Sequence, residues 1–107
     1  MEPEDFIARW TGSGQLALVG EFDSFCVPTF EAAIADRDVP NELVVDLSGL
    51  TFIDAGGLGA LVHLNRRRHA VGAPLILTGC PQGVRRLFAI TQLDELLEIQ
   101  SAPLPAT

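Results

Sequence analysis

LVVDLSGLTFIDAGGLG, residues 43–59, changes from a strand pattern to a helix pattern within one short stretch. Its first five residues are almost continuously apolar, which is typical of a strand covered on both faces in a parallel sheet. Ser48 and Gly49 loosen the backbone, and the apolar run 51–53 follows them. Beyond Asp54, apolar residues recur at helical spacing. The stretch therefore predicts a buried strand, a loosened segment and a helix that begins next to Asp54.

Strand and helix patterns alternate on both sides of this stretch. Turn residues at 11–14 separate two short apolar runs, which predicts a β-hairpin at the start of the chain. Apolar residues three and four positions apart predict helices elsewhere. The expected elements are strands at 6–10, 15–20, 43–47 and 75–77, helices at 28–36, between Asp54 and Gly72 (Leu58, Leu61, Val62 and Asn65 on one face) and around Val84, Leu87 and Phe88, and a short segment at 96–99. This alternation predicts an α/β fold, with a mixed β-sheet and helices packed on it.

Length and composition predict one globular domain. The 107 residues are 48% hydrophobic and 20% charged, which argues against disorder and leaves room for a single core. We expect this domain to span residues 1–100, followed by a disordered proline-containing tail at 101–107. No apolar run approaches the roughly 18 residues of a membrane span, and the first residues are acidic where a secretion signal is basic. These features predict a cytoplasmic protein without direct membrane insertion.

The charge balance disfavours one class of partner. Fourteen acidic and seven basic side chains give a formal net charge of −7 at pH 7. A surface of that sign repels phosphates, so neither nucleic acid nor an anionic membrane is an expected partner. The basic run at 66–68 ends a predicted helix and suits its negative C-terminal dipole. Arg85 and Arg86 begin another helix, where the dipole gives no such benefit. Solvated surface charge is the default interpretation of this pair, and contact with a partner is the alternative.

The sequence shows none of the spacings that mark a catalytic or metal site. His63 and His69 are six positions apart, so a helix does not place them on one face as a four-residue spacing would. The glycine-rich segment 56–59 lies between a strand and a helix, but a dinucleotide motif needs a further glycine at Val62 and a P-loop needs a lysine, which the chain lacks. No nucleophile is paired with a general base. We therefore predict no enzymatic activity, no metal and no cofactor.

Asp54 has a predicted local role whatever the protein does. An aspartate just before a helix caps backbone N–H groups that have no partner, which typically contributes about 1 kcal/mol. Gly56 and Gly57 then let the backbone turn sharply and leave the start of the helix bare. Such a helix start carries partial positive charge and suits either the docking of a protein or the presentation of a hydroxyl that can be modified. These residues predict an exposed, positively polarised helix start without naming what binds there.

The segment 44–59 resembles the STAS domain family, in particular its anti-sigma factor antagonists. The family signature is a strand that ends in Asp-Leu-Ser-Gly, followed by Phe-Ile-Asp-Ser-Ser-Gly-Leu and a helix, and this chain carries DLSG at 46–49 and FIDAGGL at 52–58. GEFD at 20–23 resembles the upstream Gly-Glu-Leu-Asp of the family. The pattern of strands and helices matches along residues 6–99. The resemblance implies a STAS-like domain over nearly the whole chain.

The resemblance also implies a function and a partner. Such proteins are regulators without enzymatic activity. They bind an anti-sigma factor, itself a serine kinase, and so release a sigma factor for transcription. The kinase phosphorylates the serine directly after the motif aspartate, and the added charge and bulk disrupt the complex. The partner-binding residues implied here are Asp23, Ser24, Asp54, Ala55, Gly56, Gly57, Leu58 and Leu61.

Ala55 departs from the family pattern at the phosphoacceptor position. An alanine has no hydroxyl and cannot be phosphorylated, and Gly56 replaces the second serine of the motif. We therefore expect an antagonist that lacks the usual switch. A STAS regulatory subunit of an ABC transporter is the alternative function, and a small scaffold in which Asp54 only caps a helix is a third. The final helix of the family is missing or reduced, because the end at 101–107 contains two prolines.

Overall fold

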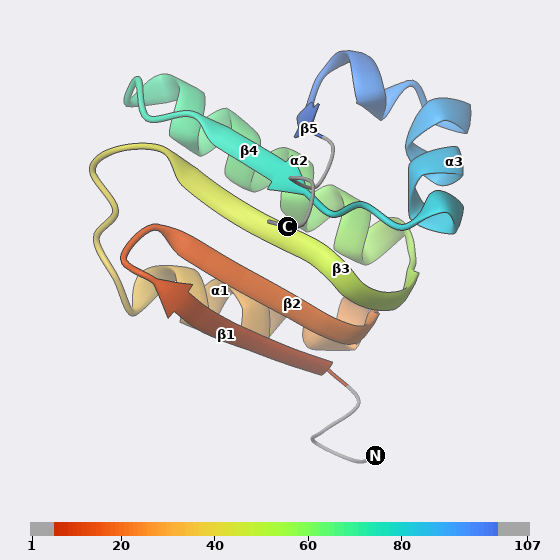
Figure 1. Cartoon of the computed structure of the whole chain (residues 1–107), viewed down its shortest axis with the longest axis horizontal. Coiled ribbons are helices and arrows are strands. Elements are labelled where there is room, and N and C mark those ends of the chain that lie inside the picture. Colours follow the sequence, from red (N-terminus) through yellow and green to blue (C-terminus); the bar gives the residue numbers. More distant parts are fainter. Residues whose placement is uncertain (1–5, 101–107) are drawn as a thin grey trace, which may run out of the picture.

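The computed structural model describes residues 6–100 as one five-stranded sheet with helices packed on it (Figure 1). The expected tail at 101–107 and the first five residues lie outside the described part. The strands are β1 (Phe6–Gly12), β2 (Gln15–Phe22), β3 (Leu43–Ile53), β4 (Leu75–Thr78) and β5 (Glu98–Gln100). The α-helices are α1 (Val27–Ala35), α2 (Ala55–Ala70) and α3 (Gln82–Ile90), with short 3-10 turns η2 (Ser24–Cys26) and η3 (Leu93–Glu95).

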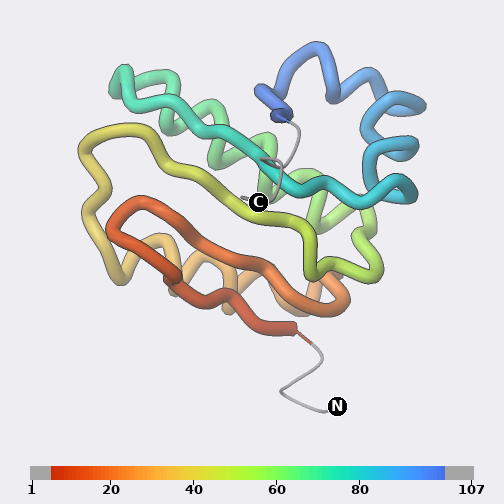
Figure 2. Tube along the Cα trace, viewed as in Figure 1, coloured from red at the N-terminus to blue at the C-terminus, as the bar shows by residue number. Residues whose placement is uncertain are grey.

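The sheet is mixed, as predicted. Its strands follow sequence order, β1-β2-β3-β4-β5, and only the β1–β2 hairpin is antiparallel. Each parallel pair needs a crossover, and α1, α2 and α3 supply the three crossovers in turn. When all crossover connections have the same handedness and each new strand is added on the same side of the previous one, their helices lie on the same face of the sheet. Figure 1 shows α1 and α2 behind the sheet, and the chain trace in Figure 2 follows the same path.

The core lies between the sheet and the helices. Every second side chain of β2 and of the first half of β3 points into it, and Leu16, Leu18 and Val45 have no exposed surface. Phe22, at the end of β2, packs against two other rings, with centroids 4.8 Å from Phe6 and 5.1 Å from Phe30 of α1. These contacts anchor the carboxyl end of β2, from which one of the two loops of the candidate site leaves.

The loosening expected at Ser48 and Gly49 does not interrupt β3, which runs through both residues, but the β2–β3 pairing is irregular there. Gly49 pairs with Val19 of β2, and a Cβ atom at position 49 would lie 2.9 Å from a methyl carbon of that valine. The glycine therefore allows the two strands to approach closely. Shifts in the β2–β3 register occur on either side of this pair and accommodate the contact.

α2 buries a broader face than the sequence pattern predicted. Leu58, Leu61 and Asn65 are buried as expected, and Leu64 joins them, whereas Val62 is only half-buried. Arg67 forms an ion pair with Glu31 of α1 at 2.8 Å. Arg68 donates hydrogen bonds to the carbonyl oxygens of Val39, at 2.9 Å, and Asn41. Two of the three arginines at 66–68 therefore hold the α1–β3 loop and α1 against α2.

Candidate functional site

The two motifs that resemble the STAS signature meet at one edge of the sheet. β2 and β3 are parallel, and their last residues, Phe22 and Ile53, are paired in register. Asp23 and Asp54 each follow directly, so the loops that they open lie side by side at the carboxyl ends of neighbouring strands. Loops at this edge of a parallel sheet are the usual place for binding residues. The register of a single strand pair therefore brings together Asp23 and Asp54, which are 31 positions apart in the sequence.

The Asp54 carboxylate joins these two loops. Its Oδ1 accepts a hydrogen bond from the backbone N–H of Gly57 at 3.1 Å, which caps α2 as the sequence predicted. Its Oδ2 accepts one from the backbone N–H of Ser24 at 3.3 Å. The Asp54 backbone also donates to the carbonyl oxygen of Phe22 at 3.3 Å. Asp54 is therefore both a helix cap and the cross-link between the loops, and the second role was not predicted.

Asp23 caps the second loop. Its Oδ1 accepts a hydrogen bond from the backbone N–H of Cys26 at 3.2 Å and so fixes the turn η2. This turn leads directly into α1, which has Pro28 in its first turn, where a missing N–H costs nothing. Two capped turns thus stand next to each other, one before α1 and one before α2.

Gly56 and Gly57 serve close packing, which corrects the predicted role of the pair. A Cβ atom at Gly57 would lie 2.4 Å from the carbonyl oxygen of Phe22, and one at Gly56 would lie 2.6 Å from the Cβ of Ser24. Neither glycine has a positive φ angle. The start of α2 is therefore pressed against the Asp23 loop, and the expected bare helix start is instead capped by Asp54 and partly covered.

Exposure separates the predicted partner-binding residues into two groups. Ser24 and Ala55 are exposed, and Asp23, Asp54 and Gly56 are half-buried. Gly57 is buried, Leu58 is 7% exposed and Leu61 is fully buried. The assignment of Leu61 to a contact surface is wrong, because its side chain points into the core, and Leu58 contributes little surface. The helical pattern had grouped these leucines on the face that packs into the core, and only the resemblance to the family had placed them in the contact surface.

Two exposed aromatic side chains flank the loops and were missed in the sequence. Phe25 of η2 is 76% exposed, and Phe52 of β3 is 49% exposed. Large apolar side chains exposed to this degree are a common feature of interaction surfaces. No sequence signal marked Phe25, whereas Phe52 lies next to the buried Ile53 and by strand alternation would point away from the core.

The exposed side of α2 continues this surface. Ala55, Gly59 and Val62 line a hollow of about 440 Å³ together with Leu93 of η3. The methyl group of Ala55 thus lies at the junction of the Asp23 loop, the start of α2 and this hollow. We call Ser24, Phe25, Phe52 and Ala55 the loop surface. It presents apolar groups and one hydroxyl.

The residues described offer no group of three or more His, Cys, Asp or Glu side chains arranged to hold a metal ion. None of the helices within residues 6–100 is long and apolar enough to cross a membrane. Burial raises the pKa of the Cys80 thiol, against a smaller opposite effect of the nearby Arg85 cation.

A mixed five-stranded sheet, with capped loops at the carboxyl ends of two adjacent parallel strands, defines the class as an α/β domain of the STAS type. The sequence matches the family described as "Mlab, STAS domain" over residues 7–98. The chain belongs to the STAS domain family, which confirms the resemblance seen in the sequence.

Relatives of known sequence and structure agree with this assignment. An anti-sigma-B factor antagonist of Listeria monocytogenes is 29% identical over 95 residues, which cover 87% of this chain and 83% of the relative. A STAS-domain containing protein of Pseudomonas aeruginosa is 33% identical over 78% of this chain and 84% of its own length. The crystal structure of an anti-sigma factor antagonist from Mycobacterium paratuberculosis superposes with a TM-score of 0.75 at 24% identity, covering 96% of this chain and 90% of that one.

Proposed function

We propose that this protein is an anti-sigma factor antagonist, a regulatory protein without enzymatic activity that acts in the cytoplasm by binding an anti-sigma factor. The observation that carries the proposal is the double hydrogen bond of Asp54, to Ser24 and to Gly57. It holds two loops in one rigid arrangement and keeps the side chain at position 55 exposed between them. A preorganised surface loses less entropy when it binds a partner. The names of relatives such as the Listeria antagonist support the same role.

The partner in this proposal is an anti-sigma factor of the serine kinase type, and the usual phosphorylation switch is absent. The family phosphoacceptor follows the motif aspartate, and here that position is Ala55. Its exposed methyl group leaves the surface in a form equivalent to the unphosphorylated state. Binding would then be constitutive, and the output would depend on how much of the protein is present.

A STAS regulatory subunit of an ABC transporter is the second candidate function. Ala55 favours it as well, because a subunit that docks permanently needs no hydroxyl at the helix start. The partner would then be a transporter component at the membrane, and the same loop surface would bind it.

The test is a calorimetric titration of the purified protein against the anti-sigma factor encoded in the same genome, with and without ATP. We expect binding at micromolar concentration that ATP does not change, and no phosphate on the protein by mass spectrometry. Phosphate on Ser24, Ser48 or Thr51 would show that the switch has moved. No binding would remove the antagonist proposal, and co-purification with an ABC transporter ATPase would then support the second candidate.

A further inference from the structure

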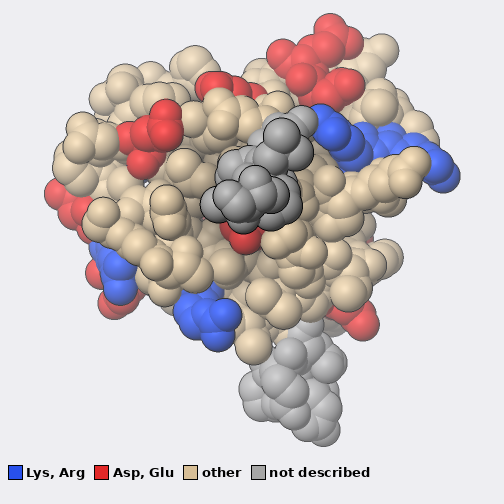
Figure 3. All heavy atoms as spheres, in the orientation of Figure 1, with Lys and Arg blue, Asp and Glu red and all other residues tan. Residues whose placement is uncertain are grey.

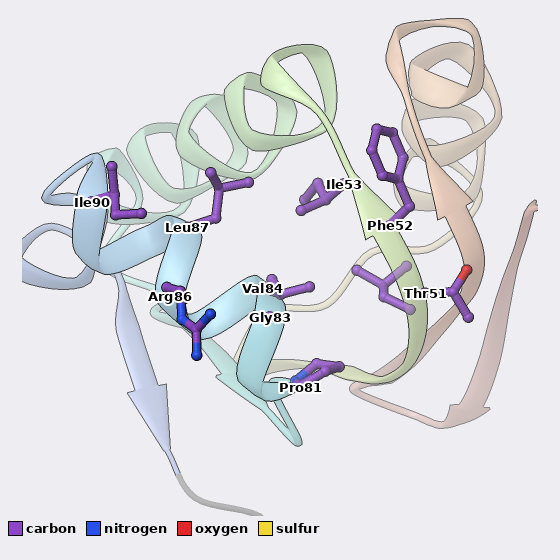
Figure 4. Close-up of a pocket in the computed structure, with 10 residues that line it drawn as sticks. Thr51, Phe52, Ile53, Pro81, Gly83, Val84, Arg86, Leu87 and Ile90 are labelled. Atoms are coloured by element: carbon purple, nitrogen blue, oxygen red, sulfur yellow. The ribbon is translucent and has the colours of Figure 1, made fainter.

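An apolar groove lies beside the loop surface, between the carboxyl end of β3 and helix α3 (Figure 4). Its volume is about 460 Å³. Figure 4 shows Val84 and Leu87 projecting from α3 toward Ile53 of β3, so apolar side chains face each other across it. Ile53 lines the groove and is followed directly by Asp54, so the groove lies next to the loop that Asp54 opens.

Exposed apolar side chains border this groove, which we call the α3 groove. Phe52 is 49% exposed at the β3 side, and Ile90 is 72% exposed at the end of α3. Beneath them Ile53 and Val84 are nearly fully buried. A hollow with an apolar floor and exposed apolar borders gains stability when an apolar side chain of another molecule fills it.

A positive charge at the groove favours an occupant that carries a negative charge. Arg86 is exposed and lies between this groove and a neighbouring hollow that also contains Asp94, and it lines both. Its neighbour Arg85 lines the second hollow but not the α3 groove. Within residues 6–100 the ion pair formed is Arg67–Glu31, so Arg86 has no ion-pair partner in the described part of the chain. Figure 3 shows basic side chains gathered over α3 on a molecule whose net charge is −7. An occupant with a carboxylate next to its apolar group satisfies this cation.

We propose that the α3 groove binds an acidic amphipathic segment of the protein partner. A bulky apolar side chain of that segment fills the space between Ile53 and Val84, and a neighbouring carboxylate binds Arg86. The inference rests on the proposed function, because it gives the partner that docks on the loop surface a second, adjacent contact. Gly83 also lines the groove, and because a Cβ atom there would meet no atom within 4 Å, a larger side chain at this position has room to occupy it.

Binding of two capped synthetic peptides, Glu-Leu-Asp-Leu-Leu-Glu and Arg-Leu-Arg-Leu-Leu-Arg, tests the groove without knowledge of the partner. Amide chemical shifts of the ¹⁵N-labelled protein are followed while each peptide is added to millimolar concentration. We expect the acidic peptide to shift the amides of Thr51, Gly83 and Ile90 and to bind at least about tenfold more tightly than the basic one. No shifts, shifts elsewhere, or equal binding of both peptides would overturn the proposal.

Two pairs of variants sharpen the test. Arg86→Glu should weaken binding of the acidic peptide by about tenfold, while Arg85→Glu, the same charge change on the same helix, should leave it within about twofold. Gly83→Leu should fill the groove and abolish binding of the acidic peptide. Ala89→Leu is the control, because residue 89 lines the neighbouring hollow, and it should leave binding of the acidic peptide unchanged. Peptide shifts that survive both Arg86→Glu and Gly83→Leu would overturn the assignment.

The same variants separate this inference from the proposed function. If the wild type fails to bind the anti-sigma factor but binds the acidic peptide at the groove, the antagonist proposal falls and the groove remains a contact for another acidic partner. If the anti-sigma factor binds wild type, Arg86→Glu and Gly83→Leu equally and the peptide does not bind, the groove assignment is wrong and the proposed function stands.

Discussion

The carboxylate of Asp54 accepts a hydrogen bond from the backbone N–H of Ser24, a residue thirty positions earlier in the chain, at 3.3 Å. The second oxygen of the same carboxylate caps α2 through Gly57. One side chain therefore fixes two turns relative to each other, and the parallel register of β2 and β3 brings those turns within its reach. Stability and recognition are coupled at this residue, and experiments on it must measure both.

Asp54→Ala should destabilise the protein by about 1–2 kcal/mol, because it removes a helix cap and leaves the Ser24 N–H without its acceptor. It should also weaken partner binding, since the two loops lose their cross-link. Urea denaturation measures the first effect, and a titration well below the melting temperature measures the second. Asp23→Ala is the matched control, because it removes one cap, to Cys26, and no cross-link. An unchanged dissociation constant for Asp54→Ala would mean that the residue has only a structural role.

Gly57→Ala should destabilise the fold by about 1–3 kcal/mol, although alanine is the better helix former. The added Cβ would lie 2.4 Å from the carbonyl oxygen of Phe22, a backbone atom held in the sheet. Gly59→Ala is the control on the same helix, where a Cβ meets no atom within 4 Å, and it should stabilise by up to about 1 kcal/mol. Thermal unfolding of both variants checks the prediction. Equal behaviour of the two would contradict the close packing of α2 on the Asp23 loop.

Most of the fold could be predicted from the sequence, because the relevant patterns are local. The apolar run at 43–47 correctly predicted a strand, and Gly72, with a φ of +69°, follows the end of α2 as expected. The expected burial of this strand on both faces is wrong, because its buried residues alternate with half-buried ones such as Val44 and Asp46. The continuity of β3 through Gly49 could not be predicted. A glycine in a strand reads as a break unless the residue it packs against, here Val19, is known.

The roles of site residues could be predicted only where a residue interacts with residues close to it in the sequence. Asp54 as the cap of α2 follows from its position before a helical pattern, but its bond to Ser24 depends on strand pairing, which is a long-range property. Leu61 was assigned to the contact surface by the resemblance, although the helical pattern groups it with the buried face of α2, where the structure places it. The exposure of Phe25 carries no local signal, since an isolated aromatic residue in a turn is compatible with either environment.

Cys80 should be alkylated more slowly in the folded protein than in a short peptide at pH 8. Burial raises the pKa of its thiol, so the reactive thiolate is a smaller fraction than in the unfolded chain, and the rate should rise as the pH rises toward the pKa. Arg85→Gln removes a cation that lowers this pKa and should slow the reaction further. Iodoacetamide labelling followed by peptide mass spectrometry measures the site directly. Labelling of Cys80 at the peptide rate, or faster labelling in Arg85→Gln, would contradict this account.

Ala55→Ser should restore a phosphoacceptor without disturbing the fold. Position 55 is exposed at the start of α2, where serine is well tolerated, so we expect the free energy of unfolding to change by less than about 0.5 kcal/mol. Partner affinity without ATP should stay within about twofold, because one hydroxyl on an exposed surface is a small change.

With ATP and a kinase-type anti-sigma factor, the Ala55→Ser variant should be phosphorylated and should release its partner. A phosphate at position 55 carries nearly two negative charges beside the Asp54 carboxylate and must lose water when the interface closes. The helix dipole favours it by only about 0.3–1 kcal/mol at an exposed site, too little to offset those costs. Titrations of the wild type and the variant, with and without ATP, give four dissociation constants, and only that of the variant with ATP should rise. Ala55→Gly, which adds no acceptor, is the control for the substitution itself. A phosphorylated variant that stays bound would place the partner on a part of the domain other than the loop surface.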